Sequence, residues 1–292
     1  MTYKKKPHWI RTKLPSQNTF HELKGIIHSG GHHTVCEEAF CPNHAECWES
    51  GTATFLLMGN ICTRACKFCD VKTGNPHKVL NNEEPEILAQ SVRKMKLNYV
   101  VLTSVDRDDL DDGGADHLSR CIKQIRKENP AVKVEILIPD FQGRVSSLKT
   151  ILLAKPDVIG HNIETVERLT PNVRDKRASY HQSLVVLQNI KKIFSKVITK
   201  SSIMLGLGET SAEVLKAFAD LRSVDVDILT IGQYLQPSKK NLEVVEYIHP
   251  EQFEQLKRQA LTKGFKYVAS GPLVRSSYRA GEIFLKEIDR SS

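Results

Sequence analysis

The sequence lacks the run of roughly 18–20 apolar residues that a membrane-spanning helix needs. Its first fifteen residues contain neither the apolar stretch nor the small-residue cleavage site of a secretory signal. We also find no internal repeat, no low-complexity linker and no nucleic-acid-binding motif. These absences predict a protein without a membrane span or a nucleic-acid partner, and the cytoplasm is its expected location.

Acidic residues are absent from the first fifteen positions, where five side chains are basic, and the net charge of the whole chain is +8. Such a segment is either a solvated tail or a patch that attracts an acidic macromolecule, and an acidic protein fits the charge as well as any other partner. The 292 residues, 40% hydrophobic and 26% charged, suffice for one large α/β domain or two small ones.

The seven cysteines are distributed very unevenly, with six of them inside 34 residues and the seventh, Cys121, alone. A cytosolic chain with clustered cysteines is more often a metal protein than a disulfide protein, because that compartment keeps thiols reduced. The six form two triplets with the spacings C-x₄-C-x₅-C and C-x₃-C-x₂-C. The first triplet is Cys36, Cys41 and Cys47, and the second triplet is Cys62, Cys66 and Cys69.

Triplets differ from the paired ligands that a structural zinc site needs to complete a tetrahedron. An iron–sulfur cluster with three thiolates has one open iron, which can bind a substrate or a cofactor. Three histidines near the first triplet, His32, His33 and His44, keep a zinc site there as an alternative. Cys121 and its apolar neighbours are spaced as on one face of a helix, so we interpret it as a small buried hydrophobic residue with no catalytic or metal-binding role.

The rest of the chain alternates between short apolar strands and amphipathic helices, which is typical of a parallel α/β protein. We expect a partial (β/α)6 barrel of the TIM type at residues 51–270, with extensions at 1–50 and 271–292. The second triplet follows a predicted strand at Thr54–Gly59, where barrel proteins carry their chemistry. Further strands are predicted at Tyr99–Thr103, Val132–Ile138, Asp157–Ile163, Val197–Met204, Ile228–Ile231 and Phe265–Val268. Helices are predicted at Pro85–Leu97, Ala115–Glu128, Val145–Ala154, Tyr180–Phe194, Ser211–Leu221 and Pro250–Lys263.

The second triplet, with Phe68 before its last cysteine and a strand before its first, resembles the signature of the radical S-adenosylmethionine (SAM) superfamily. The resemblance implies that the three thiolates hold a [4Fe-4S] cluster whose open iron chelates SAM. Polar or glycine residues at the ends of three predicted strands fit a SAM pocket. These candidates for cofactor binding are Thr103, Ser104, Asp106, Asn162, Glu164, Gly206, Gly208 and Glu209.

The first triplet just upstream narrows the resemblance to the lipoyl synthases. The segments His161–Val166, Tyr234–Pro237 and Gly271–Ala280 are similar to that family as well. The resemblance implies that Cys36, Cys41 and Cys47, with Ser277 as the fourth ligand, bind an auxiliary [4Fe-4S] cluster that is the sulfur source. It also implies that two sulfur atoms enter the sixth and eighth carbons of an octanoyl chain, with two SAM consumed.

The family further implies a protein substrate, namely an octanoylated lysine on the lipoyl-carrier domains of 2-oxoacid dehydrogenase complexes or the glycine cleavage H protein. A flavodoxin or ferredoxin is the expected reductant. A biotin synthase and a methylthiotransferase are rival enzymes, and the first triplet with Arg275–Tyr278 argues against both. An iron–sulfur electron carrier is a rival of another class, although a carrier needs four ligands for each cluster and no SAM site.

Overall fold

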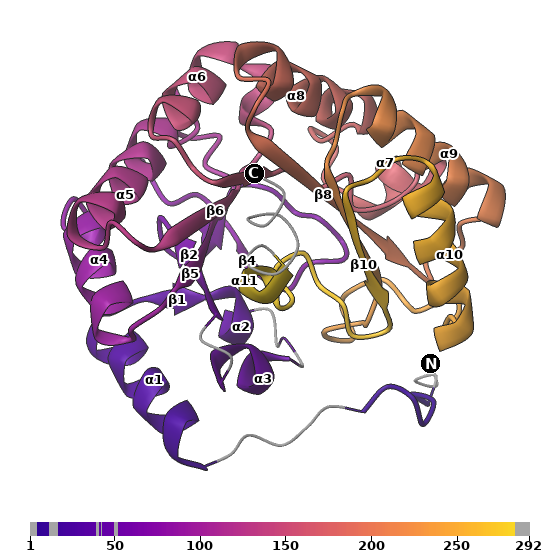
Figure 1. Cartoon of the computed structure of the whole chain (residues 1–292), viewed down its shortest axis with the longest axis horizontal. Helices are drawn as coiled ribbons and strands as arrows, with labels where there is room; N and C mark the ends of the chain where they lie inside the picture. Colours follow the sequence, from indigo (N-terminus) through magenta and orange to yellow (C-terminus); the bar gives the residue numbers. More distant parts are fainter. Residues whose placement is uncertain (1–4, 12–16, 39–40, 42, 50–51, 284–292) are drawn as a thin grey trace.

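A curved parallel sheet inside an arc of helices forms the body of the molecule (Figure 1). The computed structural model describes residues 5–11, 17–38, 41, 43–49 and 52–283. Seven parallel strands follow the order β2-β5-β6-β7-β8-β9-β10, and the short β1 joins β2 in antiparallel orientation at the edge. The expected partial barrel is therefore confirmed, with six strand–helix units and a seventh strand.

The strands are short and mostly buried. In chain order they are β1 His33–Thr34, β2 Thr52–Leu57, β5 Tyr99–Ser104, β6 Lys133–Leu137, β7 Val158–Gly160, β8 Ile198–Leu205, β9 Ile228–Gln233 and β10 Tyr267–Gly271. A separate parallel pair, β3 Ile61–Cys62 and β4 Lys72–Thr73, lies in the loop after β2. Each barrel strand matches a predicted one to within a few residues.

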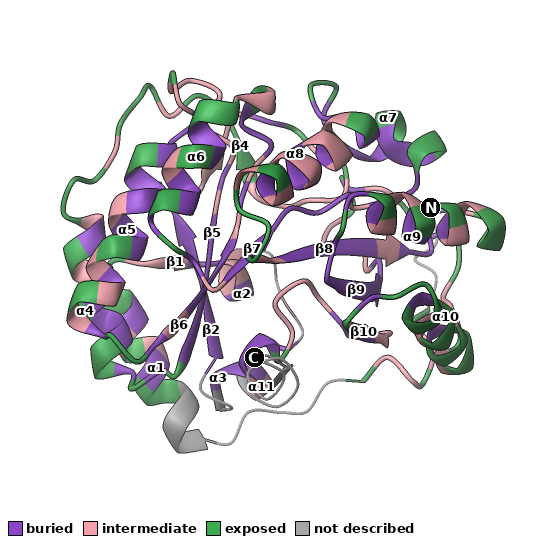
Figure 2. Ribbon diagram, turned by 45° about the horizontal axis from the view of Figure 1, so that its top comes forward, coloured by how far each residue is buried: buried purple, intermediate pink, exposed green. Residues whose placement is uncertain are grey.

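Six helices cover the outer face of the sheet, and their outward sides are exposed while the strands are buried (Figure 2). These helices are α4 Glu84–Lys94, α5 Ala115–Glu128, α6 Val145–Leu153, α8 Tyr180–Ile193, α9 Ser211–Ser223 and α10 Pro250–Thr262. Helix α9 begins with a capping box, in which Thr210 accepts from the Glu213 amide and the Glu213 side chain accepts from the Thr210 amide. In the described part of the chain no helix is both long and apolar enough to cross a membrane.

The two extensions form small elements that the sequence pattern did not predict. The amino-terminal extension contains α1 Gln17–Ser29, α2 Val35–Glu38 and α3 His44–Glu49, and short helices also occur as α7 Thr170–Val173 and α11 Ala280–Ile283. Helix α11 packs against the amino ends of two barrel strands. A Cβ on Gly281 would lie 2.8 Å from the Cβ of Tyr99 and 3.2 Å from the Oγ1 of Thr52, so only glycine fits this approach.

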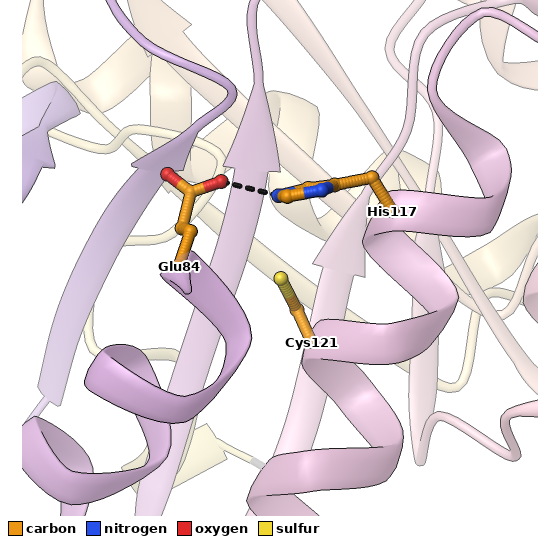
Figure 3. A group of neighbouring side chains, drawn as sticks. All are labelled: Glu84, His117 and Cys121. Carbon is orange, nitrogen blue, oxygen red and sulfur yellow. Dashed lines mark hydrogen bonds and ion pairs between the residues drawn. The ribbon is translucent and has the colours of Figure 1, made fainter. Parts of the chain in front are cut away.

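A polar clamp joins helices α4 and α5 through Glu84 and His117 (Figure 3), and Glu84 also accepts from Met58, the residue that follows β2. The Arg120 guanidinium, 3.2 Å from His117 Nδ1, can only donate, so Nε2 of His117 carries the proton. That Nε2 donates to Glu84 at 2.5 Å, and both Glu84 oxygens accept from the Met58 amide. Because Nε2 carries the proton, it has no lone pair to offer to a metal ion. Cys121 beside it is a buried, packed thiol, as expected.

Replacing His117 with alanine should lower the free energy of unfolding by about 2–3 kcal/mol, because it leaves a cavity and removes the donor to a mostly buried carboxylate. Chemical denaturation would measure the change. The control is Arg120→Ala, whose half-exposed side chain should contribute less than about 1 kcal/mol. Equal effects of the two substitutions would contradict the clamp.

Candidate active site

A cavity of about 440 Å³ lies where the carboxyl ends of the barrel strands meet, and it collects most of the residues that the sequence singled out. All three cysteines of the second triplet line it. The predicted cofactor-binding residues Thr103, Ser104, Asp106, Asn162 and Glu164 line it too, as does Ser277 from the carboxyl-terminal segment. Residues more than 200 positions apart in the chain thus share one space.

The loop of the second triplet is fixed to the barrel by a buried arginine that the sequence analysis did not single out. Arg64, between Cys62 and Cys66, is only 4% exposed. Its guanidinium donates to both oxygens of Asp108 at 2.9 Å and to those of Asp140 at 2.6 and 2.9 Å. These carboxylates follow β5 and β6, so two bidentate pairs hold the loop over the ends of two neighbouring strands.

Backbone amides point at the sulfur atoms of this loop. The Arg64 amide donates to Cys62 Sγ at 3.4 Å, and the Asp175 amide donates to Cys66 Sγ at 3.3 Å. Burial nevertheless raises the pKa of the Cys62 and Cys66 thiols to about 12. Thiols in this setting ionise at neutral pH only beside a strong positive charge, which bound iron supplies.

The first triplet is assembled against the carboxyl-terminal segment of the chain. Asn43 Nδ2 donates to the Leu273 carbonyl at 2.5 Å, and the Tyr278 hydroxyl donates to Glu46 at 3.2 Å. Two of the three cysteines face the same segment, because the Arg279 amide donates to Cys47 and the Arg275 charge lies near Cys41. These contacts come before and after Ser277 in the chain, and Ser277 itself lines the cavity.

The two triplets contain thiols that could bind a metal. All seven cysteines are described and none of them forms a disulfide. A tetrahedral zinc with Zn–S bonds near 2.3 Å needs sulfurs roughly 3.8 Å apart. Among the described residues, only Glu84, His117 and Cys121 bring three ligand atoms within 4.8 Å of one another. Neither triplet is such a group, and the side chain of His44, one of the three histidines near the first triplet, lies outside the described residues.

Two polar atoms of the cavity have no hydrogen-bond partner among the described residues. These are Ser104 Oγ and Asn162 Oδ1, both buried. A buried polar atom without a partner is costly, so a polar ligand is expected to bind there. The amino, carboxylate and ribose groups of SAM have the chemistry to do so, and the residues present thus fit this cofactor.

Two carboxylates complete the polar wall. Burial raises the pKa of Asp106 to about 6, although the nearby Arg64 charge opposes the shift. Burial also raises the pKa of Glu164, which accepts from Asn162 Nδ2 at 3.0 Å. Glu164 has φ of 66°, a strained value that is held by backbone bonds to Ser202 and Met204 of β8. Strain of this kind is typical of a residue whose side chain must be aimed at a ligand.

Three predicted cofactor-binding residues lie elsewhere. Gly206, Gly208 and Glu209 do not line the cavity in the described structure. Glu209 instead accepts from the amides of Gly206 and Leu207, closing its own loop, and the Gly206 carbonyl accepts from the Val245 amide. Their contact with SAM stays a prediction without support from this arrangement.

Lys6 and Arg275 also line the cavity, although the sequence analysis assigned neither of them to it. Arg275 donates to the carbonyls of Gln233 and Val274, and burial lowers its pKa. The Arg-Ser-Ser-Tyr segment was the sequence feature that could have predicted a cavity position for Arg275. For Lys6 the only such feature was the basic composition of the residues around it, because its position at the cavity depends on the tertiary fold.

Comparison with known proteins agrees with these features. The sequence model of the radical SAM superfamily matches residues 56–221. A lipoyl synthase of Myxococcus xanthus is 55% identical over 97% of this chain and 94% of its own length. A lipoyl synthase of Thermus thermophilus is 51% identical over 98% and 88%, and a mitochondrial one of Schizosaccharomyces pombe is 50% identical over 98% and 79%.

Solved structures show the same fold at much lower identity. A methylornithine synthase superposes with a TM-score of 0.56 at 11% identity, over 88% of this chain and 79% of its own. The FeFe-hydrogenase maturase HydG from Carboxydothermus hydrogenoformans gives 0.55 at 13% identity, over 82% and 66%.

A lipoyl synthase uses SAM and a [4Fe-4S] cluster and acts on lipoyl-carrier proteins, inserting two sulfur atoms at the sixth and eighth carbons of their lysine-bound octanoyl group. The second triplet, the cavity and identity above 50% over nearly the whole chain agree with that activity. This chain belongs to the lipoyl synthase family of radical SAM enzymes.

Proposed function

We propose that this enzyme works with two [4Fe-4S] clusters, one at the cavity that the second triplet lines and one at the first triplet, whose cysteines do not line that cavity themselves. Cys62, Cys66 and Cys69 hold the cluster that binds SAM. Cys36, Cys41 and Cys47, with the Ser277 oxygen as fourth ligand, hold the auxiliary cluster, which is the sulfur source. The arrangement divides the chain into an amino-terminal extension to residue 50, a barrel at 51–270 and a carboxyl-terminal extension from 271.

One observation carries the proposal, namely that Ser277 and the second triplet line the same cavity. The contacts of Asn43 with Leu273 and of Tyr278 with Glu46 support the ligand role of the serine, because they dock its segment onto the first triplet. An oxygen ligand is harder than the three thiolates around it and is expected to be the more labile one on iron.

When bound, the clusters and SAM supply a carbon-centred radical that abstracts hydrogen and the sulfur that replaces it. The chain itself positions these groups and excludes competing hydrogen donors. Arg64 fixes the second-triplet loop, and Ser104 with Asn162 offers free polar atoms to SAM. Leu56, Val101 and Leu137 provide apolar surface for a hydrocarbon chain.

The number of SAM molecules consumed and the partner proteins belong to the same proposal. We expect two SAM to be consumed for each lipoyl group and a flavodoxin or ferredoxin to deliver the electrons in the cytoplasm. The carriers are expected to be the lipoyl domains of 2-oxoacid dehydrogenase complexes and the glycine cleavage H protein. Exposed Lys6 at the cavity, together with the net charge of +8, favours an acidic carrier surface.

Substituting Cys36, Cys41 or Cys47 with alanine should leave SAM cleavage to 5′-deoxyadenosine intact and abolish lipoyl formation. Substituting Cys62, Cys66 or Cys69 should abolish both, because the SAM-binding cluster loses an anchor. Iron and sulfide counts on anaerobically prepared protein should fall from about eight of each to about four in every case. Retained SAM cleavage in the second group would show that the two triplets are assigned the wrong way round.

Ser277→Ala should lower lipoyl formation at least about a hundredfold with little effect on SAM cleavage, because a ligand that tunes a metal site typically contributes ten- to hundredfold or more. Ser276→Ala is the matched control, since this neighbour lines the same cavity and should lose less than about threefold. Electron paramagnetic resonance of the auxiliary cluster should change only in the Ser277 variant. Interchanged results for the two serines would move the ligand to Ser276.

A further inference from the structure

The cavity is deep, and inward-facing residues line it in two layers. The upper layer contains Leu56, Thr103 and Leu137, near the carboxyl ends of β2, β5 and β6. The lower layer contains Thr54, Val101 and Glu135, each two residues earlier on the same strand. Because side chains two apart on a strand point to the same side, the cavity extends one full layer into the barrel.

A charged pair lies at the lower end of this space. Glu135 accepts from Lys200 Nζ at 2.7 Å and from the Tyr99 hydroxyl at 2.6 Å, and all three side chains are buried. Lys200 comes from β8 and reaches Glu135 of β6 across the intervening strand β7, where the register partner of Lys200 is Gly160 and that of Glu135 is Val158. Tyr99 packs in one apolar cluster with Val158 and Ile228, the register partners of Glu135 and Lys200, and with Ala280 of α11 at the amino ends of the strands.

The reaction requires such a closed end. The eighth carbon of an octanoyl group is its terminal methyl, so one of the two reacting carbons is the tip of the substrate. A hydrocarbon chain that could slide further into an apolar shaft would move this methyl past the reacting groups. The cavity must therefore stop the chain at one depth, within a fraction of the 1.3 Å or so that one methylene spans.

We propose that the Glu135–Lys200 pair is the end stop for the acyl chain and sets the preference of this enzyme for eight carbons. The inference rests on the proposed function, because it takes the cavity lined by the second triplet and Ser277 as the octanoyl site. Glu135 contacts the cavity directly, Lys200 holds its carboxylate from one side, and the Tyr99 hydroxyl holds it from the other. Glu135 is thus a specificity-determining residue, with Lys200 and Tyr99 as positioning residues.

An ion pair makes a firmer stop than an apolar side chain would. A leucine or methionine at this place could change rotamer and yield space to a longer chain. The Glu135 carboxylate can move only by leaving Lys200 and Tyr99, which would separate the charges of a buried ion pair, and such a separation is strongly destabilising. No hydrocarbon can compensate for those bonds, and the floor therefore stays in place when a longer chain enters.

A matched pair of double variants tests this role without leaving a lone buried charge. Glu135→Ala with Lys200→Met removes the pair and deepens the cavity. Glu135→Gln with Lys200→Met removes the same charges but keeps a side chain of equal length at the floor. Each protein, with reconstituted clusters, is given hexanoyl-, octanoyl- and decanoyl-lysine peptides, and both peptide affinity without SAM and sulfur insertion with SAM are measured.

The wild type and the glutamine variant should prefer the octanoyl over the decanoyl peptide. The alanine variant should shift the decanoyl-to-octanoyl ratio of affinities toward decanoyl by about tenfold, because each additional buried methylene contributes roughly fourfold. An unchanged ratio in the alanine variant would overturn the inference. Failure of the wild type to convert the octanoyl peptide would overturn the proposed function instead.

If the double variant does not fold, Val101→Leu tests the same inference by making the cavity shallower instead of deeper. This residue lies beside Glu135 in the lower layer, and the added methylene raises the floor. The affinity ratio should then shift from octanoyl toward hexanoyl, by about fourfold for one methylene. A lower affinity for all three peptides without a change of ratio would contradict an end stop at this depth.

Discussion

The pairing of Arg64 with Asp108 and Asp140 is the interaction on which the rest of the site depends. A guanidinium buried within the cysteine loop would be strongly destabilising alone, and two bidentate carboxylates make the burial tolerable. The carboxylates come from the ends of neighbouring parallel strands. The loop can therefore adopt its conformation only on a correctly formed barrel, so the fold and the second-triplet site are specified together.

The carboxyl-terminal segment plays the corresponding part for the first triplet. It leaves β10, passes Asn43 and Glu46 beside the cysteines, presents Ser277 to the cavity and reaches α11 at the amino ends of the barrel strands. The close approach of Gly281 to Tyr99 fixes the far end of this path. Because Tyr99 also binds Glu135, the segment that completes the upper site lies against the residue that holds the cavity floor.

The cavity thus divides the barrel into a polar entrance and a closed interior. Free polar atoms and buried carboxylates gather where the strands end, and below them Leu56, Leu137 and Val101 provide apolar wall above one charged pair. This gradient matches the chemistry of a substrate that is polar at its amide and purely hydrocarbon at its tip. It also explains why the barrel interior contains a lysine and a glutamate, which are rarely buried unless paired.

Local patterns were sufficient for much of the fold. Alternation of short apolar runs with amphipathic stretches located the seven barrel strands and six covering helices, because period and flanking turn residues are local properties. The small helices α2 and α3 were missed, since four to six residues carry too little periodicity. The loop at Gly206–Glu209 looked like a ligand loop, yet its carboxylate binds its own backbone, which no composition reveals.

The sequence by itself determined the cysteine spacing, the strand–helix order and the resemblance that identified the family, because each of these depends on the order of residues along the chain and not on contacts between distant residues. Only the tertiary structure decided which distant groups meet. Arg64 finds Asp140 from 76 positions away, Glu135 finds Lys200 from 65, and Asn43 finds Leu273 from 230. Their pairing depends on strand order and on the closure of the barrel, and a linear pattern contains neither.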